Sequence, residues 1–326
     1  MPREKARVLY FSHAGDDVYR LVRQAAGADF DMLFLKADCD EERCRMIAQC
    51  EAVICAATPI RRHHLDAATK LAVIHHQGVG WQDTTDWPEI KRRGLPLAIT
   101  TAGTTTGVAE HTVLLMLAAA KRLAFADAEL RRGAWHVNAL RGVSRELFGK
   151  AIGYVGMGRI AQAVAERLTA FGCSGIYFDP RVRLDDTDHR RLGLRCGDLD
   201  EVLAAADVLT IHVPLTEATR GLIGGAALAK LKPGAIVVNT ARGGIVDEAA
   251  LADALRSGQV LAAGLDAFEQ EPPGPDNPLL DLPNVVLTPH ISAGTADAMQ
   301  EKMSALFDNL RRFFASGELD NRVTFP

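Results

Sequence analysis

Hydrophobic residues along this 326-residue chain gather in short runs, separated by stretches whose polar and apolar positions follow a helical period. Apolar runs of about 4–8 residues with polar or glycine-rich flanks are typical of buried strands in parallel sheets. Five such runs predict strands in the first hundred residues, at 7–11, 31–35, 52–56, 72–75 and 96–99. Helix-forming stretches lie between most of them, which indicates a small α/β unit.

A long apolar helix is expected at residues 108–122, and a second series of strands follows it. The predicted strands of this series are 151–155, 175–178, 208–211, 235–238, 261–265 and 285–287. Six strands with intervening helices fit a doubly wound dinucleotide-binding fold. Residues 269–283 hold five prolines and are expected to be loop. One more helix, at 296–314, is expected to end the chain.

The composition narrows the class of protein. The length suits two domains, and 48% hydrophobic with 24% charged residues is typical of a soluble globular protein. A net charge of −4 provides no general surface for nucleic acid. We see neither an apolar run long enough for a bilayer nor the apolar region of a signal peptide, so we expect no membrane partner and a cytoplasmic location.

The six cysteines form no C-x-x-C pair. They are Cys39, Cys44, Cys50, Cys55, Cys173 and Cys196. The first four cluster at spacings of five, six and five, which leaves a metal site open, but free or buried thiols in a reducing compartment fit better. We therefore predict no metal site, and we expect His63 and His64 at the surface.

Residues 156–161 carry a G-x-G-x-x-A motif. It consists of Gly156, Met157, Gly158, Arg159, Ile160 and Ala161, between a predicted strand and a predicted helix. Gly156 permits a tight turn, Gly158 lets a pyrophosphate approach the backbone, and the helix N-terminus favours its charge. Asp179 ends the next predicted strand, 21 residues after Gly158, where a carboxylate can bind the ribose hydroxyls. Asp179 favours NAD, although the nearby Arg181 leaves NADP open.

Three further motifs follow predicted strands at the carboxyl edge of the same sheet, where ligands bind in such folds. They occupy residues 238–247, 264–272 and 288–294. Together with the glycine motif they resemble the D-isomer-specific 2-hydroxyacid dehydrogenase family, and the resemblance covers nearly the whole chain. It implies a flavodoxin-like substrate domain of residues 1–100 and 292–326, a doubly wound Rossmann NAD-binding domain of residues 101–291, and a homodimer.

The resemblance also implies roles for single residues. Arg242 binds the substrate carboxylate and polarises the 2-oxo group, His290 passes the proton, Glu271 pairs with His290, and Asp266 contacts the nicotinamide carboxamide. These residue types suit the chemistry, since arginine offers a permanently charged fork, histidine carries protons at neutral pH, and a carboxylate stabilises its cation. The predicted cofactor-binding residues are Gly156, Met157, Gly158, Arg159, Ile160, Asp179, His212, Val213, Pro214, Thr219, Thr240, Ala241, Asp266 and Ala293.

In the N-terminal part, residues 77–80 resemble the family loop whose backbone amides hold the substrate carboxylate, here at Val79 and Gly80. The next residues depart from the family, because Trp81-Gln82-Asp83 places glutamine where an acidic residue is usual. His75, His76 and Trp81 either line the pocket or pack at a strand end. Trp135 and His136 either line the pocket or contact a dimer partner.

The sequence therefore predicts an NAD-dependent enzyme that moves a hydride between NADH and a small 2-oxo/2-hydroxy acid. Glyoxylate, hydroxypyruvate, pyruvate and larger 2-oxo acids all stay open as substrates. Formate dehydrogenases of the family resemble the chain less, because they carry glutamine where this chain has Glu271. The alternative is an NAD-binding corepressor-like scaffold with little turnover.

Overall fold

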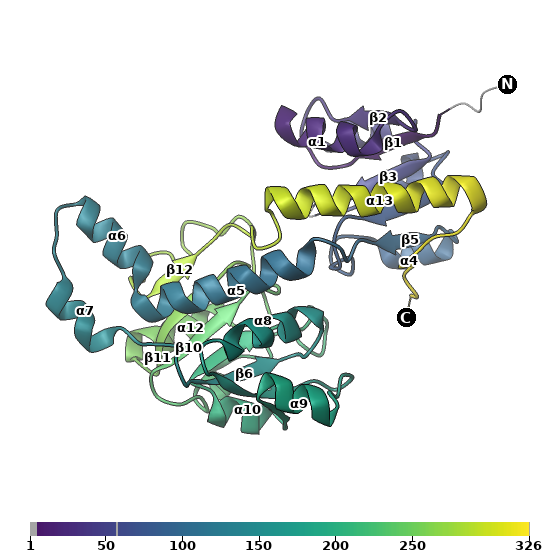
Figure 1. Cartoon of the computed structure of the whole chain (residues 1–326). Coiled ribbons are helices and arrows are strands. Elements are labelled where there is room, and N and C mark those ends of the chain that lie inside the picture. The colour runs from purple at the N-terminus through teal and green to yellow at the C-terminus, as the bar shows by residue number, and fades with distance from the viewer. Residues whose placement is uncertain (1–4, 57, 326) are drawn as a thin grey trace. The chain divides into compact units, whose positions relative to one another are not determined.

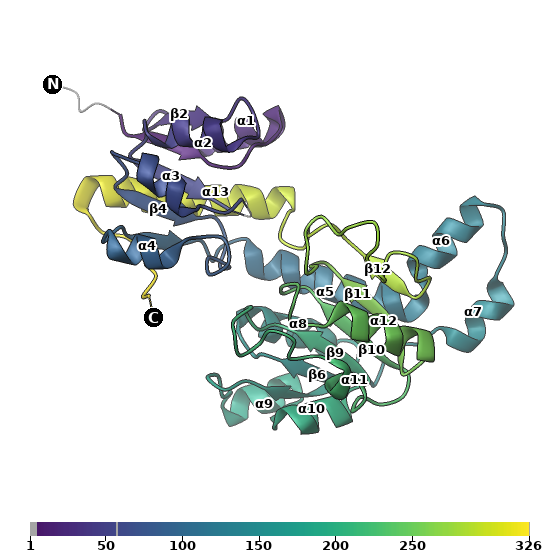
Figure 2. The same ribbon diagram turned by 180° about the vertical axis from the view of Figure 1, so that it is seen from behind.

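The computed structural model describes residues 5–56 and 58–325. It divides into two compact units, one formed by the segments up to Thr104 and from Thr295 onward, the other by Thr105–Gly294. Each unit has one parallel sheet with helices on both faces (Figures 1 and 2). The predicted α/β class is confirmed.

The first unit has strand order β2-β1-β3-β4-β5, the flavodoxin-like order predicted for it. Its elements are β1 (Arg7–Tyr10), α1 (Asp16–Ala26), β2 (Asp31–Phe34), α2 (Asp40–Ile47), β3 (Ala52–Cys55), α3 (Arg62–Ala67), β4 (Val73–His76), α4 (Trp87–Arg92), β5 (Leu97–Ile99) and α13 (Ala296–Ser316). The five predicted strands are all present.

Alternation along the strands of the first unit separates two cores. Val8 and Tyr10 of β1 pack with α1 and α13, whereas Leu9 and Phe11 pack with residues of α2, α3 and α4. Because both faces are buried, the strands read as continuous apolar runs. His64 belongs to the second core, with 1% of its surface exposed and its ring 5.0 Å from that of Phe11, so its predicted surface position is wrong.

The second unit contains the remaining elements. They are α5 (Thr104–Lys121, whose first residue belongs to the first unit), α6 (Leu123–Arg131), α7 (Val137–Val143), β6 (Ala151–Val155), α8 (Arg159–Thr169), β7 (Ser174–Phe178), α9 (Asp186–Leu192), β8 (Leu194–Cys196), α10 (Leu199–Ala205), β9 (Val208–Ile211), α11 (Gly225–Leu228), β10 (Ala235–Asn239), α12 (Glu248–Ser257), β11 (Val260–Leu265) and β12 (Val285–Leu287).

The strand order of this unit is β12-β11-β10-β9-β6-β7-β8, a doubly wound sheet. The predicted count of six strands is wrong, because β8 forms the edge beside β7. Only Leu194 of its three residues is buried, so no apolar run marks it. Among the described residues, none of the helices combines the length and apolarity of a membrane span.

The end of the chain also differs from the prediction. Beyond α13 the chain returns to the first sheet, where Arg322 bridges Ala98 antiparallel and the Val323 amide donates to Leu97 O at 2.7 Å. A Gly317 in the left-handed region lets the chain turn back after α13. Both ends of the described chain therefore help to build the first unit.

Candidate functional site

Glu271 and His290 form an ion pair at the carboxyl edge of the second sheet. His290 Nδ1 lies 2.9 Å from Glu271 Oε1 and 2.8 Å from Oε2. Both side chains are partly exposed, at 36% and 39%. Because a carboxylate only accepts, Nδ1 carries a proton, and Nε2 is left as the atom that can exchange a proton with a bound molecule.

The environment of Glu271 favours its charged form. Burial raises its pKa, but the hydrogen bonds from His290 and from the Phe268 amide outweigh burial and lower the pKa below the usual value. The positive charge of Arg242 acts in the same direction. Glu271 therefore presents a negative charge to the His290 ring at neutral pH.

Asp266 holds the backbone that carries His290. It is fully buried at the end of β11, and its carboxylate accepts from the Thr288 hydroxyl at 2.6 Å and from the Ile291 and Ser292 amides at 2.9 Å. His290 itself has φ +52°, a left-handed conformation that non-glycine residues rarely adopt. Such strain needs surrounding contacts to sustain it, and these bonds supply them.

His111 extends this network, and sequence reasoning assigned it no role. Its Nε2 lies 2.9 Å from Thr288 Oγ1 and 3.6 Å from Asp266 Oδ1. The contact between His111 and Thr288 joins α5 to the loop after β12, and no local sequence pattern predicts such a tertiary contact.

The Arg242 loop is shaped by Asn239, the last residue of β10. The Asn239 side chain donates to Arg242 O at 2.8 Å and accepts from the Ala241 amide at 3.0 Å. One guanidinium nitrogen of Arg242 donates to Ala241 O at 2.9 Å. Gly243 packs against the backbone of Phe268, so the Arg242 loop and the Glu271 loop lie together.

His212 also lies at this sheet edge. Burial lowers its pKa to about 3, and its Nε2 lies 2.9 Å from Thr210 Oγ1. A histidine that stays neutral at working pH cannot supply a proton. His290 is therefore the better proton carrier.

The glycine motif forms a cradle with room for a phosphate. Gly156 has φ +95°, and a Cβ there would lie 2.8 Å from the His212 backbone, so only glycine fits the turn. Gly158 caps α8 and faces open space, with no atom within 4 Å of a Cβ position. Asp179 accepts from the Met157 amide at 2.8 Å. These residues fit a dinucleotide whose pyrophosphate meets the start of α8.

In the first unit, His76 holds the predicted substrate loop. Thr84 Oγ1 lies 3.0 Å from Gly80 O and 3.0 Å from His76 Nε2. His76 Nδ1 lies 2.9 Å from Gly78 O and 3.0 Å from the Gly78 amide nitrogen. This chain of bonds fixes the backbone around Val79 and Gly80.

Comparison with known proteins decides the family. Residues 113–292 match the model of the D-isomer specific 2-hydroxyacid dehydrogenase NAD binding domain. The chain belongs to this dehydrogenase family. The matched domain is the family's NAD-binding domain and includes the cradle at Gly156–Gly158, and NAD is the cofactor of this family.

Individual relatives agree with the family. The chain is 43% identical over 287 residues to a D-3-phosphoglycerate dehydrogenase of Archaeoglobus fulgidus, which covers 88% of this chain and 54% of that protein. It is 42% identical to a hydroxypyruvate reductase of Thermotoga maritima over 76% of this chain and 79% of that one. A solved glyoxylate reductase from Paecilomyes thermophila matches with TM-score 0.85 and 30% identity over 99% of each chain. The chain spans about half the length of the curated phosphoglycerate dehydrogenases it matches.

The remaining cofactor residues suggested by the family lie on segments that follow strands of the second sheet or open α8. Arg159 and Ile160 start α8; His212, Val213, Pro214 and Thr219 follow β9; Thr240 and Ala241 follow β10; Ala293 lies in the segment after β12. Thr240 is buried, and its hydroxyl lies 2.8 Å from Thr112 Oγ1 of α5. That bond ties the loop to the helix, which suits a positioning role.

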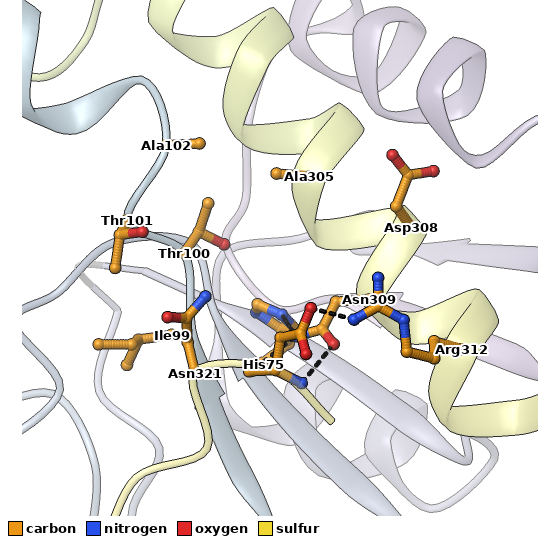
Figure 3. Close-up of a pocket in the computed structure, with 11 residues that line it drawn as sticks. His75, Ile99, Thr100, Thr101, Ala102, Ala305, Asp308, Asn309, Arg312 and Asn321 are labelled. Carbon is orange, nitrogen blue, oxygen red and sulfur yellow. Dashed lines mark hydrogen bonds and ion pairs between the residues drawn. The ribbon is translucent and has the colours of Figure 1, made fainter. Parts of the chain in front are cut away.

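Trp81 and His75, which lie near the loop at residues 77–80 in the sequence, pack inside the first unit. Trp81 packs edge-on to Trp87 and Phe325. His75 is 1% exposed and accepts from Asn309 Nδ2 at 3.0 Å. It also lines a cavity of about 230 Å³ between α13 and the end of β5, whose lining shares no residue with the loop at 77–80 (Figure 3). The remaining lining residues are Ile99, Thr100, Thr101, Ala102, Ala305, Asp308, Asn309, Arg312, Asp320 and Asn321.

Proposed function

We propose that this protein is an NAD-dependent D-2-hydroxyacid dehydrogenase that interconverts a small 2-oxo acid and its 2-hydroxy acid. The observation that carries the proposal is the Glu271–His290 pair, with Nδ1 bound by the carboxylate and the charge of Arg242 beside it. An acid, its orienting base and a guanidinium are the groups that ketone reduction next to a carboxylate requires.

Arg242 stabilises charge on the substrate, and His290 transfers the proton. Bound NADH supplies the hydride to the 2-carbon. Arg242 binds the substrate carboxylate through its planar fork and stabilises negative charge on the 2-oxygen. His290 Nε2 gives that oxygen its proton, and Glu271 stabilises the imidazolium before transfer. In the reverse direction His290 starts neutral and accepts the hydroxyl proton.

We assign the first unit as substrate domain and the second as nucleotide domain; the boundaries predicted above, at residues 100 and 292, each lie a few residues before those of the two units. The amides of Val79 and Gly80 are assigned to the substrate carboxylate. The hydrogen bonds of His76 and Thr84 support this assignment, because they hold the loop backbone in one conformation. We also assign Asp266 to the cofactor carboxamide, the role that the family resemblance gives it.

A substrate panel tests the activity. Glyoxylate, hydroxypyruvate, pyruvate, 3-phosphohydroxypyruvate and a larger aromatic 2-oxo acid are each assayed with NADH and with NADPH. We expect turnover of at least one acid, and at least about tenfold higher kcat/KM with NADH, since Asp179 repels a 2′-phosphate. Binding of NADH without turnover of any acid would instead favour the corepressor-like scaffold. A preference for NADPH would point to Arg181 as the phosphate partner.

We also propose a homodimer. Helix α6 lies against the edge strand β12, and α7 stands farther from the sheet of their unit (Figures 1 and 2). On and beside them, Leu123, Leu130, Trp135, Val137 and Phe148 are exposed, and Trp135 and Phe148 each expose 76% of their surface. Large apolar side chains gathered this way are typical of interfaces. Trp135→Glu is expected to convert a dimer to a monomer in light scattering, whereas a wild type that is already monomeric would overturn the proposal.

The cysteines support the expected cytoplasmic location. All six are free in the described structure. Free thiols persist in a reducing compartment.

A further inference from the structure

Helices α2 and α3 of the first unit bring one thiol and two imidazoles together. The ligand atoms of Cys44 on α2 and of His63 and His64 on α3 all lie within 4.8 Å of one another. Asp40, one turn before Cys44, contacts both rings: its Oδ2 lies 3.1 Å from His63 Nε2 and its Oδ1 lies 3.4 Å from His64 Nε2. None of these residues belongs to the dehydrogenase site described above.

His64 shows that hydrogen bonds do not satisfy the cluster. The residue is 1% exposed, and among the described residues its buried Nε2 makes no hydrogen bond of good geometry; its polar neighbour is Asp40 Oδ1 at 3.4 Å. Its Nδ1 accepts from the Arg61 amide at 3.1 Å, so Nε2 is the nitrogen that faces Asp40 and the cluster. Buried polar nitrogens in folded proteins are almost always satisfied, and an unsatisfied one calls for a ligand or ion that completes it.

We propose that Cys44, His63 and His64, with Asp40 as the fourth donor, form a binding site for a zinc-class transition-metal ion. Thiolate and imidazole donors select zinc and its neighbours, whereas calcium and magnesium take oxygen ligands. Sulfur, two nitrogens and one carboxylate oxygen complete a tetrahedral set. The two residues of α2 are four apart and so share one helix face, and that face meets the start of α3.

Metal binding moves three protons in this site. The Cys44 thiol releases its proton to solvent as the sulfur bonds the ion. His63 Nε2, whose proton points to Asp40 Oδ2 at 3.1 Å, passes that proton to Nδ1 so that Nε2 can bond the metal. The proton of neutral His64 also moves from Nε2 to Nδ1, so the Arg61 amide loses its acceptor. Ligands of one zinc ion at about 2.0–2.3 Å stand roughly 3.5 Å apart, so the side chains close in from their present spacing. Four ligand bonds replace the hydrogen bonds of His63 with Asp40 and of His64 with the Arg61 amide.

The site would fasten α2 to α3 close to the substrate loop. The residue before Arg61 is Ile60, whose amide donates to Thr84 O at 2.9 Å and whose carbonyl accepts from the Asp86 amide at 2.9 Å. Thr84 is the residue that bonds His76 and Gly80 O. An ion at the start of α3 therefore stiffens a segment that is hydrogen-bonded to the loop, and it takes no part in the hydride chemistry.

Cobalt titration of the whole, chelator-treated protein tests the proposal. Co²⁺ is expected to bind at one equivalent, with thiolate-to-cobalt charge-transfer absorption in the near ultraviolet and strong visible bands of a tetrahedral ion. Zn²⁺ is expected to displace it and to raise Tm. Cys44→Ser is expected to remove the charge-transfer band, and the half-exposed His63→Ala to weaken binding by at least about tenfold.

Cys39→Ser is the matched control, since Cys39 is the N-cap of the same helix but lies outside the cluster. It is expected to leave the spectrum unchanged. The absence of a charge-transfer band in the wild type, or its persistence in Cys44→Ser, would overturn the proposal. Circular dichroism and NADH binding establish that each variant is folded. Reduction of 2-oxo acids is measured separately, so the metal site and the proposed dehydrogenase activity can fail independently.

Discussion

Gly243 lies so close to Phe268 that a side-chain carbon at position 243 would stand 1.8 Å from the Phe268 carbonyl oxygen. The Arg242 loop and the Glu271 loop therefore fit together only with glycine at this position. Gly243→Ala must push the loops apart, and displacement of about 1 Å in a catalytic array can cost roughly 10²-fold. We expect kcat/KM for the best 2-oxo acid to fall by about that factor.

Gly142→Ala is the control for this change, since Gly142 lies in α7 with no atom within 4 Å of a Cβ position. Its activity is expected to match the wild type. If Gly243→Ala kept full activity, the packing of the two loops would have no catalytic importance.

Glu271→Gln tests the proton carrier through the pH profile. Since the pKa of Glu271 is lowered, the carboxylate stays charged through the neutral and mildly acidic range and loses its charge only below its usual value. Glutamine keeps the size but removes the charge that stabilises imidazolium. The acid-side decline of kcat/KM for reduction that accompanies protonation of Glu271 is expected to be absent from the variant, which has no carboxylate to titrate, and kcat/KM at neutral pH is expected to fall. A variant with wild-type kcat/KM at neutral pH would mean that Glu271 only positions the ring.

His290→Asn is expected to lower reduction and oxidation alike, by about 10²–10⁴-fold at every pH, because no proton donor or acceptor remains. NADH binding, followed by fluorescence, is expected to stay near the wild-type value. Substantial turnover in this variant would remove His290 from the mechanism.

Arg242→Ala tests the substrate contact. Loss of the carboxylate fork and of charge stabilisation at the 2-oxygen is expected to raise KM and to lower kcat, with kcat reduced about 10²–10³-fold. Arg242→Lys is expected to recover little, because an ammonium cannot make the paired contact. Steady-state kinetics with saturating NADH checks both variants, and near-normal turnover in Arg242→Ala would contradict the assignment.

His75 predicts a pH dependence of stability. Burial lowers its pKa from 6.5 to about 4, so the unfolded chain binds the proton more tightly than the folded one. Stability is full above pH 6.5 and falls as the pH drops towards 4, with His75 contributing about 3 kcal/mol of the loss. Urea unfolding at about pH 7.5, 5.5 and 4.5 measures it. In His75→Gln, the free energy of unfolding of the first unit is expected to vary less with pH than in the wild type. The same variation with pH in both proteins would contradict this.

Most of the fold could be predicted because buried parallel strands leave continuous apolar runs. The strand β8 could not, because a three-residue edge strand buries one side chain. The segment after α13 was missed for a related reason: its bond to Leu97 uses backbone atoms, which carry no sequence signal. Turn chemistry near Gly156 was visible in the sequence because only glycine fits its positive φ.

Only part of the candidate site could be predicted from the sequence. Arg242, Glu271 and His290 were found through motifs, and the model places the Glu271 and His290 side chains in contact. The residues that hold the site in place, Asn239, Thr288 and His111, were not predicted, because they act through contacts that arise only in the folded chain. The expected surface position of His64 failed in the same way, because burial at a helix start depends on the neighbouring helix α2.

Helix α13 shares with α1 the covering of one face of the first sheet, yet it is synthesised after all five strands of that sheet. During synthesis at about 5–20 residues per second, the strands β1 to β5 emerge roughly 10–40 s before α13 does. The second unit is continuous in sequence and is synthesised before Leu306 and Phe307 can pack on Val8, Ile54 and Val73. Until α13 emerges, these apolar residues of the first sheet are therefore incompletely covered in the nascent chain.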